Sequence, residues 1–237
     1  MKRILLPGIA AIGVGLAVLA ACLVLTAGTE AGGIYHNEGS GASASFYSEE
    51  GTVATYVDVY ASDYVDQSPP GRPHKDSSAS ICIRQQDSST GEVLLDACGW
   101  TSLPEPAFQI DKGLKNASLH AVINVCPWWP PLSPTPEPSP SPVEAPEVSP
   151  TPPPTPTPGP CFDVDVDMTW VGTGPLSRQN QHSHYHSPDF NDNWHCNDTW
   201  RGASAAGSVS DDGTNFTPNP ADWAEMSAGK CGGVTIG

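Results

Sequence analysis

Hydrophobic and polar residues alternate along several short stretches of the chain, and this period of two is typical of β-strands that bury one face. Before residue 127 the stretches are 53–60, 79–84, 93–97 and 119–125, and after residue 160 they are 162–170, 201–209 and 234–236. Turn residues 87–91 separate the second stretch from the third, which predicts a β-hairpin over 81–97. One helical turn is expected at 220–226, with Trp223 and Met226 on the same side. No longer helical periodicity is present, so the pattern predicts an all-β protein.

A proline-rich segment divides these strands into two groups. Residues 127–160 hold 16 prolines in 34 residues, many of them in Ser-Pro, Thr-Pro and Glu-Pro steps. Proline fixes φ and has no amide hydrogen to donate, so this segment can neither join a sheet nor continue a helix. We predict a disordered linker that runs as polyproline II. Its composition favours a stiff, low-complexity spacer over a recognition segment for a partner with an aromatic groove.

The strands after the linker are too few to fold alone. Residues 161–237 offer three predicted strands with few aliphatic residues, and a core of under roughly 80 residues is marginal without added cross-links. Together with residues 32–126 they supply enough strands for two packed sheets. We therefore predict one antiparallel, immunoglobulin-like β-sandwich that the proline-rich insertion interrupts, with two tandem β modules as the alternative. The strand content resembles secreted bacterial immunoglobulin-like sandwiches, although the cysteine pair and core tryptophan of antibody domains are not evident.

Residues 1–31 have the features of an export signal or a membrane anchor. Two basic residues precede an uncharged run of 26 residues, which is long enough to cross about 30 Å of hydrocarbon as a transmembrane helix. Three outcomes stay open, namely cleavage before Gly32, lipidation of Cys22, and retention as an anchor. Each of them predicts that the rest of the chain is extracytoplasmic, either secreted or tethered to the cell membrane.

Cysteine usage agrees with export. Beyond Cys22 the chain has an even number of cysteines, and no two of them form a Cys-x-x-Cys pair, so disulfides are favoured over a thiolate zinc site. Strand geometry ranks the pairings: one pair faces across the predicted hairpin, one closes the ends of the linker, and the remaining two cysteines pair with each other. The predicted disulfides are therefore Cys82–Cys98, Cys126–Cys161 and Cys196–Cys231.

The charge balance excludes one class of partner. The chain has 10 Lys and Arg residues against 26 Asp and Glu residues, a formal net charge of -16. Nucleic-acid binding needs clustered Lys and Arg side chains to neutralise phosphates. The basic residues beyond the first 31 stand singly in the sequence, so we expect no nucleic-acid partner.

A histidine-rich stretch is the main candidate for metal chemistry. Four of the seven histidines fall between positions 182 and 195. On an extended segment His182, His184 and His186 would project to one side, and with His195 they form a ligand set that suits Zn²⁺ or Cu²⁺. The interpretation that we favour is a polar, exposed loop over 178–198 in which the histidines are only solvated.

Two other patterns resemble functional motifs but lack their context. Asp163, Asp165 and Asp167 are spaced like the start of a calcium loop, yet the sixth position is Met168 instead of glycine, so a solvated strand face is expected. Ser204 lies in a sequence similar to a hydrolase elbow, but no helix is predicted after it. No metalloprotease, phosphate-loop or dinucleotide motif occurs, and we predict that the protein is not an enzyme.

These inferences combine into a disulfide-stapled, non-catalytic surface or binding module that lies outside the cytoplasm and needs no cofactor. An extracellular protein or glycan is the expected partner, and the sequence does not identify it. The alternative is an extracytoplasmic transition-metal-binding protein that uses the four clustered histidines.

Overall fold

Eleven β-strands make up all the regular structure in residues 33–67, 73–128, 159–187 and 190–236, which are the residues described by the computed structural model. In chain order the strands are β1 (Gly33–Glu50), β2 (Val53–Asp66), β3 (His74–Asp87), β4 (Val93–Ser102), β5 (Phe108–Ile110), β6 (Asn116–Pro127), β7 (Phe162–Gly172), β8 (Ser177–Ser187), β9 (Phe190–Asp211), β10 (Thr214–Asn215) and β11 (Trp223–Ile236). Their pairings run antiparallel. The predicted all-β, antiparallel class is therefore confirmed.

The strand pairings close on themselves. β1, β2, β3 and β4 follow one another as a meander, and β4 then pairs with β6. The circuit continues from β6 through β7, β9 and β11 and returns to β1. β8 lies beside β9, while the short strands β5 and β10 add to β6 and β9. This closure brings strands from both sides of the linker into one sheet.

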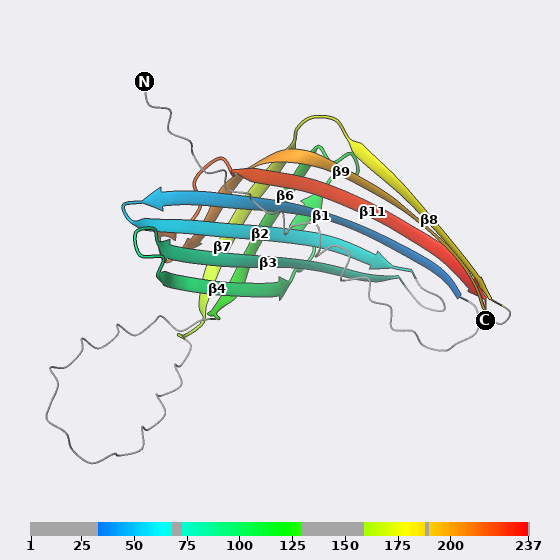
Figure 1. The fold of residues 1–237 in the computed structure, drawn as a ribbon, viewed down its shortest axis with the longest axis horizontal. Helices are drawn as coiled ribbons and strands as arrows, with labels where there is room; N and C mark the ends of the chain where they lie inside the picture. Colours follow the sequence, from blue (N-terminus) through cyan, green and yellow to red (C-terminus); the bar gives the residue numbers. More distant parts are fainter. Residues whose placement is uncertain (1–32, 68–72, 129–158, 188–189, 237) are drawn as a thin grey trace, which may run out of the picture. The chain divides into compact units, whose positions relative to one another are not determined.

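Two layers of strands face each other across a single core. Figure 1 shows β11, β1, β2, β3 and β4 side by side in one layer, here called the front layer, while β6 and β7 cross behind them in the back layer. One alternate set of side chains from each strand is buried between the layers, such as Val57 and Val59 in β2 and Val164 and Val166 in β7. The alternation of hydrophobic and polar residues in the sequence therefore results from the burial of one face of each strand in this core.

Trp170 connects the two layers directly. Its side chain is fully buried in β7, and its indole Nε1 donates a hydrogen bond of 2.9 Å to the carbonyl oxygen of Ser43 in β1. A buried indole N–H without an acceptor would lower the stability of the fold. The hydrogen bond to Ser43 avoids this cost and lets the largest core side chain extend from the back layer to the front layer.

β9 takes part in both layers. Residues 203–210 pair with β7 in the back layer, whereas residues 191–202 pair with β11 in the front layer. Gly207 makes the close approach to β7 feasible, because an added Cβ there would overlap the carbonyl oxygen of Asp167 and lie 2.8 Å from the Cα of Met168. The φ of Gly207 is 152°, which L side chains rarely adopt.

Three disulfides join neighbouring strands or chain segments, and they are the pairs that the sequence spacing predicts. They are Cys82–Cys98, Cys126–Cys161 and Cys196–Cys231. The first and the third each link residues that are directly opposed in adjacent strands. Proteins stapled in this way are typical of oxidising, extracytoplasmic compartments.

The helical turn predicted at 220–226 is wrong. β11 already begins at Trp223, and it pairs with β1 on one side and with β9 on the other, so its backbone hydrogen bonds are made within the sheet. In a strand, residues three apart point to opposite faces. Trp223 is accordingly exposed and Met226 is fully buried, rather than both lying on the same side.

The number of strands after the linker is also larger than predicted. Five strands, β7 to β11, follow it instead of three. β8, and also β1 before the linker, were not expected from the alternation because both strands are built largely of small and polar residues. Their extended conformation comes from pairing with long neighbours, which is information that a period in hydrophobicity does not carry.

Residues 129–158 lie outside the described residues, so disorder of the proline-rich linker stays a prediction. The strands on its two sides nevertheless pair with each other, β6 with β7 and β1 with β11. The predicted export signal or anchor, residues 1–31, also lies outside the described residues. Among the residues that are described, no helix is long and apolar enough to cross a membrane.

Replacement of Trp170 by alanine should destabilise the fold strongly. The substitution leaves a large cavity between the layers and removes the donor to Ser43, and we expect a loss of about 3–5 kcal/mol in the free energy of unfolding. Chemical denaturation measures it. Trp128→Ala is the matched control because Trp128 is 72% exposed; equal losses for the two variants would contradict the structure.

The turn between β3 and β4 should depend on the ionised carboxylate of Asp87. The hydroxyl of Ser89 and the backbone amides of Thr90 and Ser89 donate to this carboxylate and lower its pKa from 3.8 to about 2. Because the folded pKa is depressed, the stabilisation is complete above 3.8 and is lost as the pH falls toward 2. NMR titration of the Asp87 carboxyl should give a midpoint near 2. Asp87→Asn should lower the melting temperature near neutral pH, whereas Asp165→Asn should leave it nearly unchanged.

Candidate functional site

The histidines singled out in the sequence lie where the front layer continues beyond the core. Figure 1 shows β8 and the neighbouring parts of β9, β11 and β1 running together past the back layer. We call this part the extension; it comprises β8, residues 190–200, residues 227–236 and residues 33–40. Every side chain of β8 from Ser177 to His186 is exposed whichever face it points to. The expected polar loop over 178–198 is therefore wrong, because most of these residues form strands.

Strand register places three histidines in one row. His182 is directly opposite His195, His195 is opposite Gly232, and Gly232 is opposite His36 in β1. Directly opposed residues point to the same face of a sheet. This is the face that becomes the core-facing side further along the front layer, since Met226 of β11 and Ala42 of β1 follow at an even spacing. We call it the inner face of the extension.

His184 and His186 follow His182 on the inner face at intervals of two residues. The structure thus brings His182 and His195 next to each other and leaves the other two further along β8. His182 Nε2 lies 2.9 Å from Asn193 Oδ1, within hydrogen-bond distance. No group of three or more His, Cys, Asp or Glu residues is placed to hold a metal ion within the described ranges. The predicted four-histidine site for Zn²⁺ or Cu²⁺ stays a prediction.

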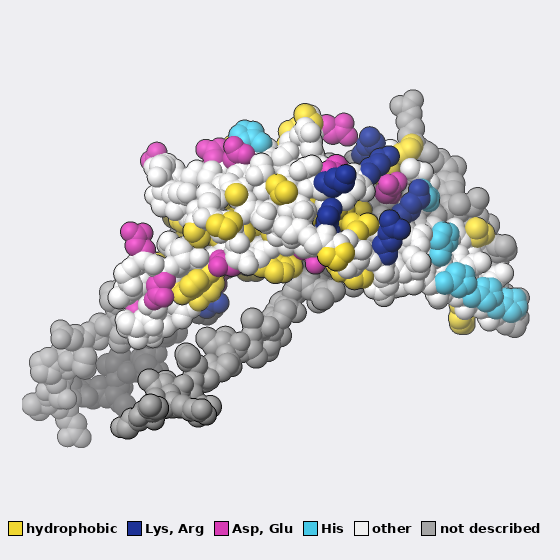
Figure 2. Space-filling model, turned by 90° about the horizontal axis from the view of Figure 1, so that it is seen from above, with side chains coloured by type: hydrophobic (Ala, Val, Ile, Leu, Met, Phe, Trp, Pro, Cys, Tyr) yellow, Lys and Arg dark blue, Asp and Glu magenta, His cyan; other side chains and the backbone are white. Residues whose placement is uncertain are grey.

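The inner face of the extension is the less acidic side of the sheet. Arg178, Arg201 and Lys230 share it with the histidines, and Lys230 forms an ion pair of 3.9 Å with Glu38. Figure 2 shows Lys and Arg side chains gathered beside a row of histidines. The basic residues that stand singly in the sequence are therefore partly brought together by the pairing of β8, β9 and β11.

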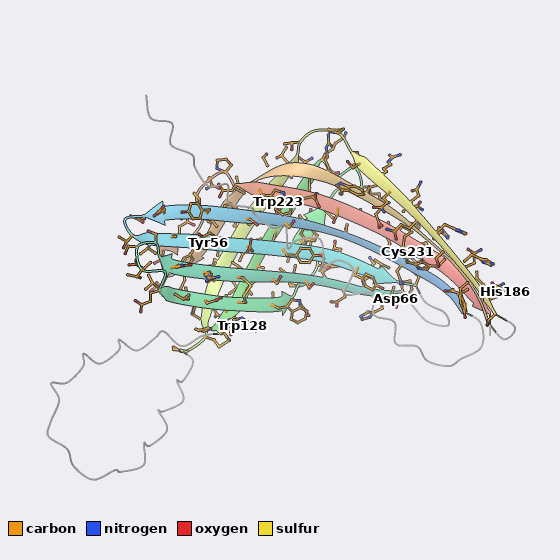
Figure 3. All side chains as sticks on the ribbon, viewed as in Figure 1. Tyr56, Asp66, Trp128, His186, Trp223 and Cys231 are labelled. Carbon is orange, nitrogen blue, oxygen red and sulfur yellow. A yellow bond between two sulfur atoms is a disulfide. The ribbon has the colours of Figure 1, made fainter. Side chains whose placement is uncertain are left out.

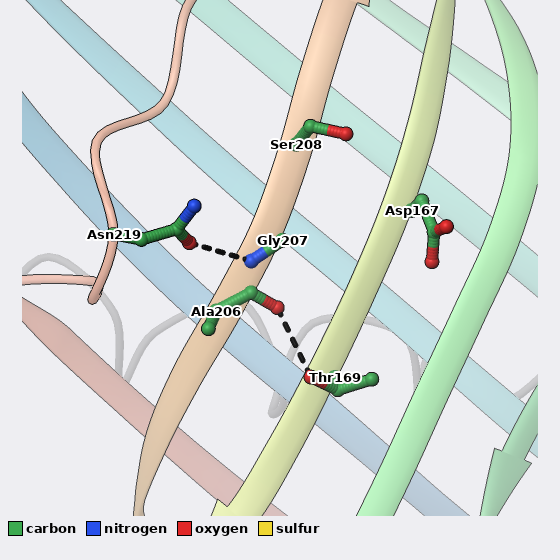
Figure 4. A pocket seen from close by; sticks show the side chains of 6 residues that line it. All are labelled: Asp167, Thr169, Ala206, Gly207, Ser208 and Asn219. Atoms are coloured by element: carbon green, nitrogen blue, oxygen red, sulfur yellow. Dashed lines mark hydrogen bonds between the residues drawn. The ribbon is translucent and has the colours of Figure 1, made fainter.

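A shallow depression of about 370 Å³ lies on the outside of the back layer. Figure 4 shows the six residues that line it, which are Asp167, Thr169, Ala206, Gly207, Ser208 and Asn219. The Asn219 carboxamide accepts a hydrogen bond from the Gly207 amide at 2.7 Å, and the Thr169 hydroxyl donates to the Ala206 carbonyl at 3.2 Å.

Asp163 and Asp165 point to the same side as Asp167, between buried valines, as expected for a solvated strand face.

Ser204, the serine of the elbow-like sequence, lies inside β9 opposite Val171 of β7. The strand continues beyond it to Asp211. Its backbone is therefore part of a regular ladder and not of a strand-to-helix turn, which is the geometry that a nucleophilic elbow requires.

The outer side of the front layer carries a group of aromatic side chains that sequence analysis did not identify. Five of them are exposed, and a sixth, Tyr60, is half-buried; the exposed five are Trp100 (62%), Trp223 (49%), Tyr56 (43%), Tyr47 (42%) and Tyr64 (37%). They come from β1, β2, β4 and β11, and the register puts them all opposite to the core. We call these six residues the outer aromatic face. Figure 3 labels Tyr56 and Trp223 at the end of the layer that lies away from His186.

Two tyrosines of the outer aromatic face lie over glycines. A Cβ added to Gly41 would be 3.3 Å from the hydroxyl of Tyr60, and one added to Gly39 would be 3.7 Å from Cδ2 of Tyr64. The rings therefore occupy the space that side chains of β1 would otherwise fill. Tyr47 and Tyr56, which are directly opposed, have ring centroids 5.0 Å apart.

Small hydroxyl side chains and carboxylates fill the gaps between the rings. Seven serines face outward, namely Ser43, Ser45, Ser62, Ser78, Ser80, Ser102 and Ser227. Ser45 donates to Asp58 at 2.6 Å, and Tyr47 donates to Glu49 at 3.1 Å, which is the main reason that the pKa of Tyr47 is raised. Burial raises the pKa of Glu225, which lies opposite Ser43.

Part of the outer aromatic face had a signal in the sequence. Tyr56, Asp58 and Tyr60 alternate with valines in the predicted strand 53–60, so their outward direction follows from the period alone. Trp100 and Trp223 are 123 residues apart in the sequence, and only the order of strands in the sheet places both on one surface.

Comparison with known proteins gives no relative from which a function could be transferred: the chain matches no protein-family model, no curated protein and no solved structure.

The histidines of the extension should bind transition metals only weakly. We expect removal of metal with a chelator to leave the melting temperature unchanged, because a ligand that stabilises the native state must bind it tightly. His182→Ala combined with His195→Ala should weaken Zn²⁺ binding in calorimetry, whereas His120→Ala on β6 should not. A shift of several degrees on chelation would instead establish a structural metal site.

Proposed function

We propose that the protein is a non-catalytic, extracytoplasmic binding module, secreted or tethered through residues 1–31, and that the outer aromatic face is its contact surface. The observation that carries this proposal is the exposure of five aromatic side chains on one side of one layer. Grouped apolar side chains that stay exposed mark interaction sites on soluble proteins, because burying them against a partner releases free energy that folding has not used.

The character of these side chains supports a binding role. Tryptophan and tyrosine are enriched among the residues that dominate binding energy, since each presents a large rigid ring and a polar atom. The outward side of the back layer offers a contrast: the large exposed hydrophobic residues of β6 and β7 are Val122 and Val171, and neither of these two strands turns a phenylalanine, tyrosine or tryptophan ring outward. β6 and β7 therefore lack the outward tyrosine and tryptophan side chains that the front layer carries.

The three disulfides support the proposed location, because they are stable in oxidising compartments. The sandwich gives the face a rigid support, because both edge strands of the front layer are paired: β4 pairs with β6, and β11 pairs with β9. An immunoglobulin-like relationship of this sandwich remains part of the proposal.

A second candidate function is transition-metal binding on the inner face of the extension. One observation favours it: the carboxamide oxygen of Asn191, opposite His186, is buried and has no hydrogen-bond partner. Buried acceptors are usually satisfied, and a cation bound by a neighbouring imidazole would satisfy this one.

Truncation of single residues of the outer aromatic face should weaken attachment to the partner. Trp100→Ala and Tyr56→Ala should each reduce retention of the purified protein on washed cell-surface material of its native host at least about tenfold, as expected for dominant contact residues. Both side chains are exposed, so the melting temperature should change little. Val122→Ala is the control because Val122 is 58% exposed on the back layer. Wild-type protein that is not retained, or retention that none of the aromatic variants alters, would refute this function.

A further inference from the structure

We infer that the ligand of the outer aromatic face is a polysaccharide that carries no acidic groups, and this inference rests on the binding function proposed above. Four features of the face select this class of ligand: the way in which the rings lie, the residues between them, the sign of the charge, and the extent of the surface.

The rings are disposed for stacking. Tyr60 and Tyr64 extend over Gly41 and Gly39 of the neighbouring strand, so they lie along the sheet instead of standing out from it. A ring that lies along a surface presents its π face, and the π face attracts positively polarised hydrogens. The C–H groups on the flat side of a sugar ring are such hydrogens, and they meet an aromatic ring over a broad area.

The residues between the rings suit a partner rich in hydroxyl groups. Serine, aspartate and glutamate are depleted at protein–protein interfaces, yet seven serines and several carboxylates surround these rings. Hydroxyl and carboxylate oxygens can exchange hydrogen bonds with sugar hydroxyls, each of which both donates and accepts. This composition favours a glycan over the apolar patch of a protein.

The charge of the face excludes acidic glycans. Six carboxylates point outward from the front layer, those of Glu49, Asp58, Asp66, Asp76, Asp96 and Glu225, against the one guanidinium of Arg84. A uronate or a sulfated polymer would be repelled, because like charges brought together at an interface cost several kcal/mol by order of magnitude. Neutral sugars are tolerated, and amino sugars would gain from the carboxylates and from cation–π contacts.

The extent of the face matches a chain rather than a single sugar. Tyr60 and Trp100 lie in one row with Ser80 between them, so their strands are roughly 10 Å apart. From Trp223 on β11 to Trp100 on β4 the face crosses five adjacent strands, roughly 19 Å. No enclosed cavity is needed for such a ligand, which would lie across the strands and contact several rings in turn.

The decisive experiment uses the cell-surface retention assay with full-length protein. The cell-surface material is divided into untreated, periodate-oxidised and protease-treated portions; periodate cleaves vicinal diols of sugars and leaves the protein under test untouched once it is quenched. We expect retention to fall at least tenfold after periodate and to persist after protease, with the tenfold loss corresponding to one strong aromatic contact. Trp100→Ala and Val122→Ala serve as the deficient and matched control variants.

The outcomes separate this inference from the function on which it rests. Retention that needs Trp100 but survives periodate and is lost after protease would overturn the polysaccharide and leave the binding function intact. Retention that does not need any aromatic residue of the face would overturn both. The inference is supported if retention is lost after periodate treatment and if neither added protein nor a change in salt concentration restores it.

Affinity electrophoresis then distinguishes neutral, amino-sugar and acidic polysaccharides as ligands. Hydroxyethylcellulose serves as the neutral probe, glycol chitosan as the amino-sugar probe and polygalacturonate as the acidic probe. We expect retardation by the neutral or the amino-sugar polymer and none by polygalacturonate. Added salt should weaken only binding to glycol chitosan, because salt screens charge attraction and leaves stacking unaffected. Retardation by polygalacturonate alone would overturn the inference.

Discussion

The strands of the front layer are longer than the core that they cover, and both surfaces of interest follow from this mismatch. β1 has 18 residues, but within 36–50 its buried residues occur only between Gly41 and Phe46, where they alternate with half-buried serines. Where the back layer covers the sheet, one set of alternate side chains is apolar and buried, and the other set is free to carry recognition residues. Beyond the back layer most side chains are at least partly exposed, and every side chain of β8 from Ser177 to His186 is exposed.

The outer aromatic face and the inner face of the extension lie on opposite sides of the same strands. Because successive side chains of a strand point to opposite faces, neighbouring residues can serve different chemistry without interfering. In β9, for instance, Arg201 and His195 point inward, whereas Trp200 and Asp198 point outward. Carboxylates and aromatic rings are concentrated on one side, and imidazoles and guanidinium groups on the other.

The extension has little packing to hold it. Its stability rests on backbone pairing of β8, β9, β11 and β1 and on the Cys196–Cys231 disulfide between its two central strands. A cross-link at this place limits the conformations open to the unfolded chain where hydrophobic burial contributes least. The other two disulfides lie on core strands: Cys82–Cys98 joins β3 to β4, and Cys126–Cys161 joins β6 to the residue before β7.

The aromatic rings show which features of a strand its local sequence pattern can predict. The alternation of valine with tyrosine in β2 determines that Tyr56 and Tyr60 point outward, whatever the fold. The stacking of these rings over glycines of β1 depends on the β1–β2 register instead. For the histidines, a strand period suffices to align His182 with His184, whereas the nearness of His195 and the row that continues to His36 are consequences of pairing.

The all-β class, the direction of side chains in the strongly alternating strands and the disulfides could all be predicted from the sequence, because each depends on residues near in sequence or on a small number of cysteines. Prediction from the sequence failed for β1 and β8, whose small and polar residues have no hydrophobic period, and for the turn at 220–226, where sheet pairing outweighed local helical preference. Tertiary structure alone decided that Trp100 and Trp223 share a surface. That juxtaposition depends on the order of five strands, and strand order is set by long-range backbone hydrogen bonds that leave no local mark on the sequence.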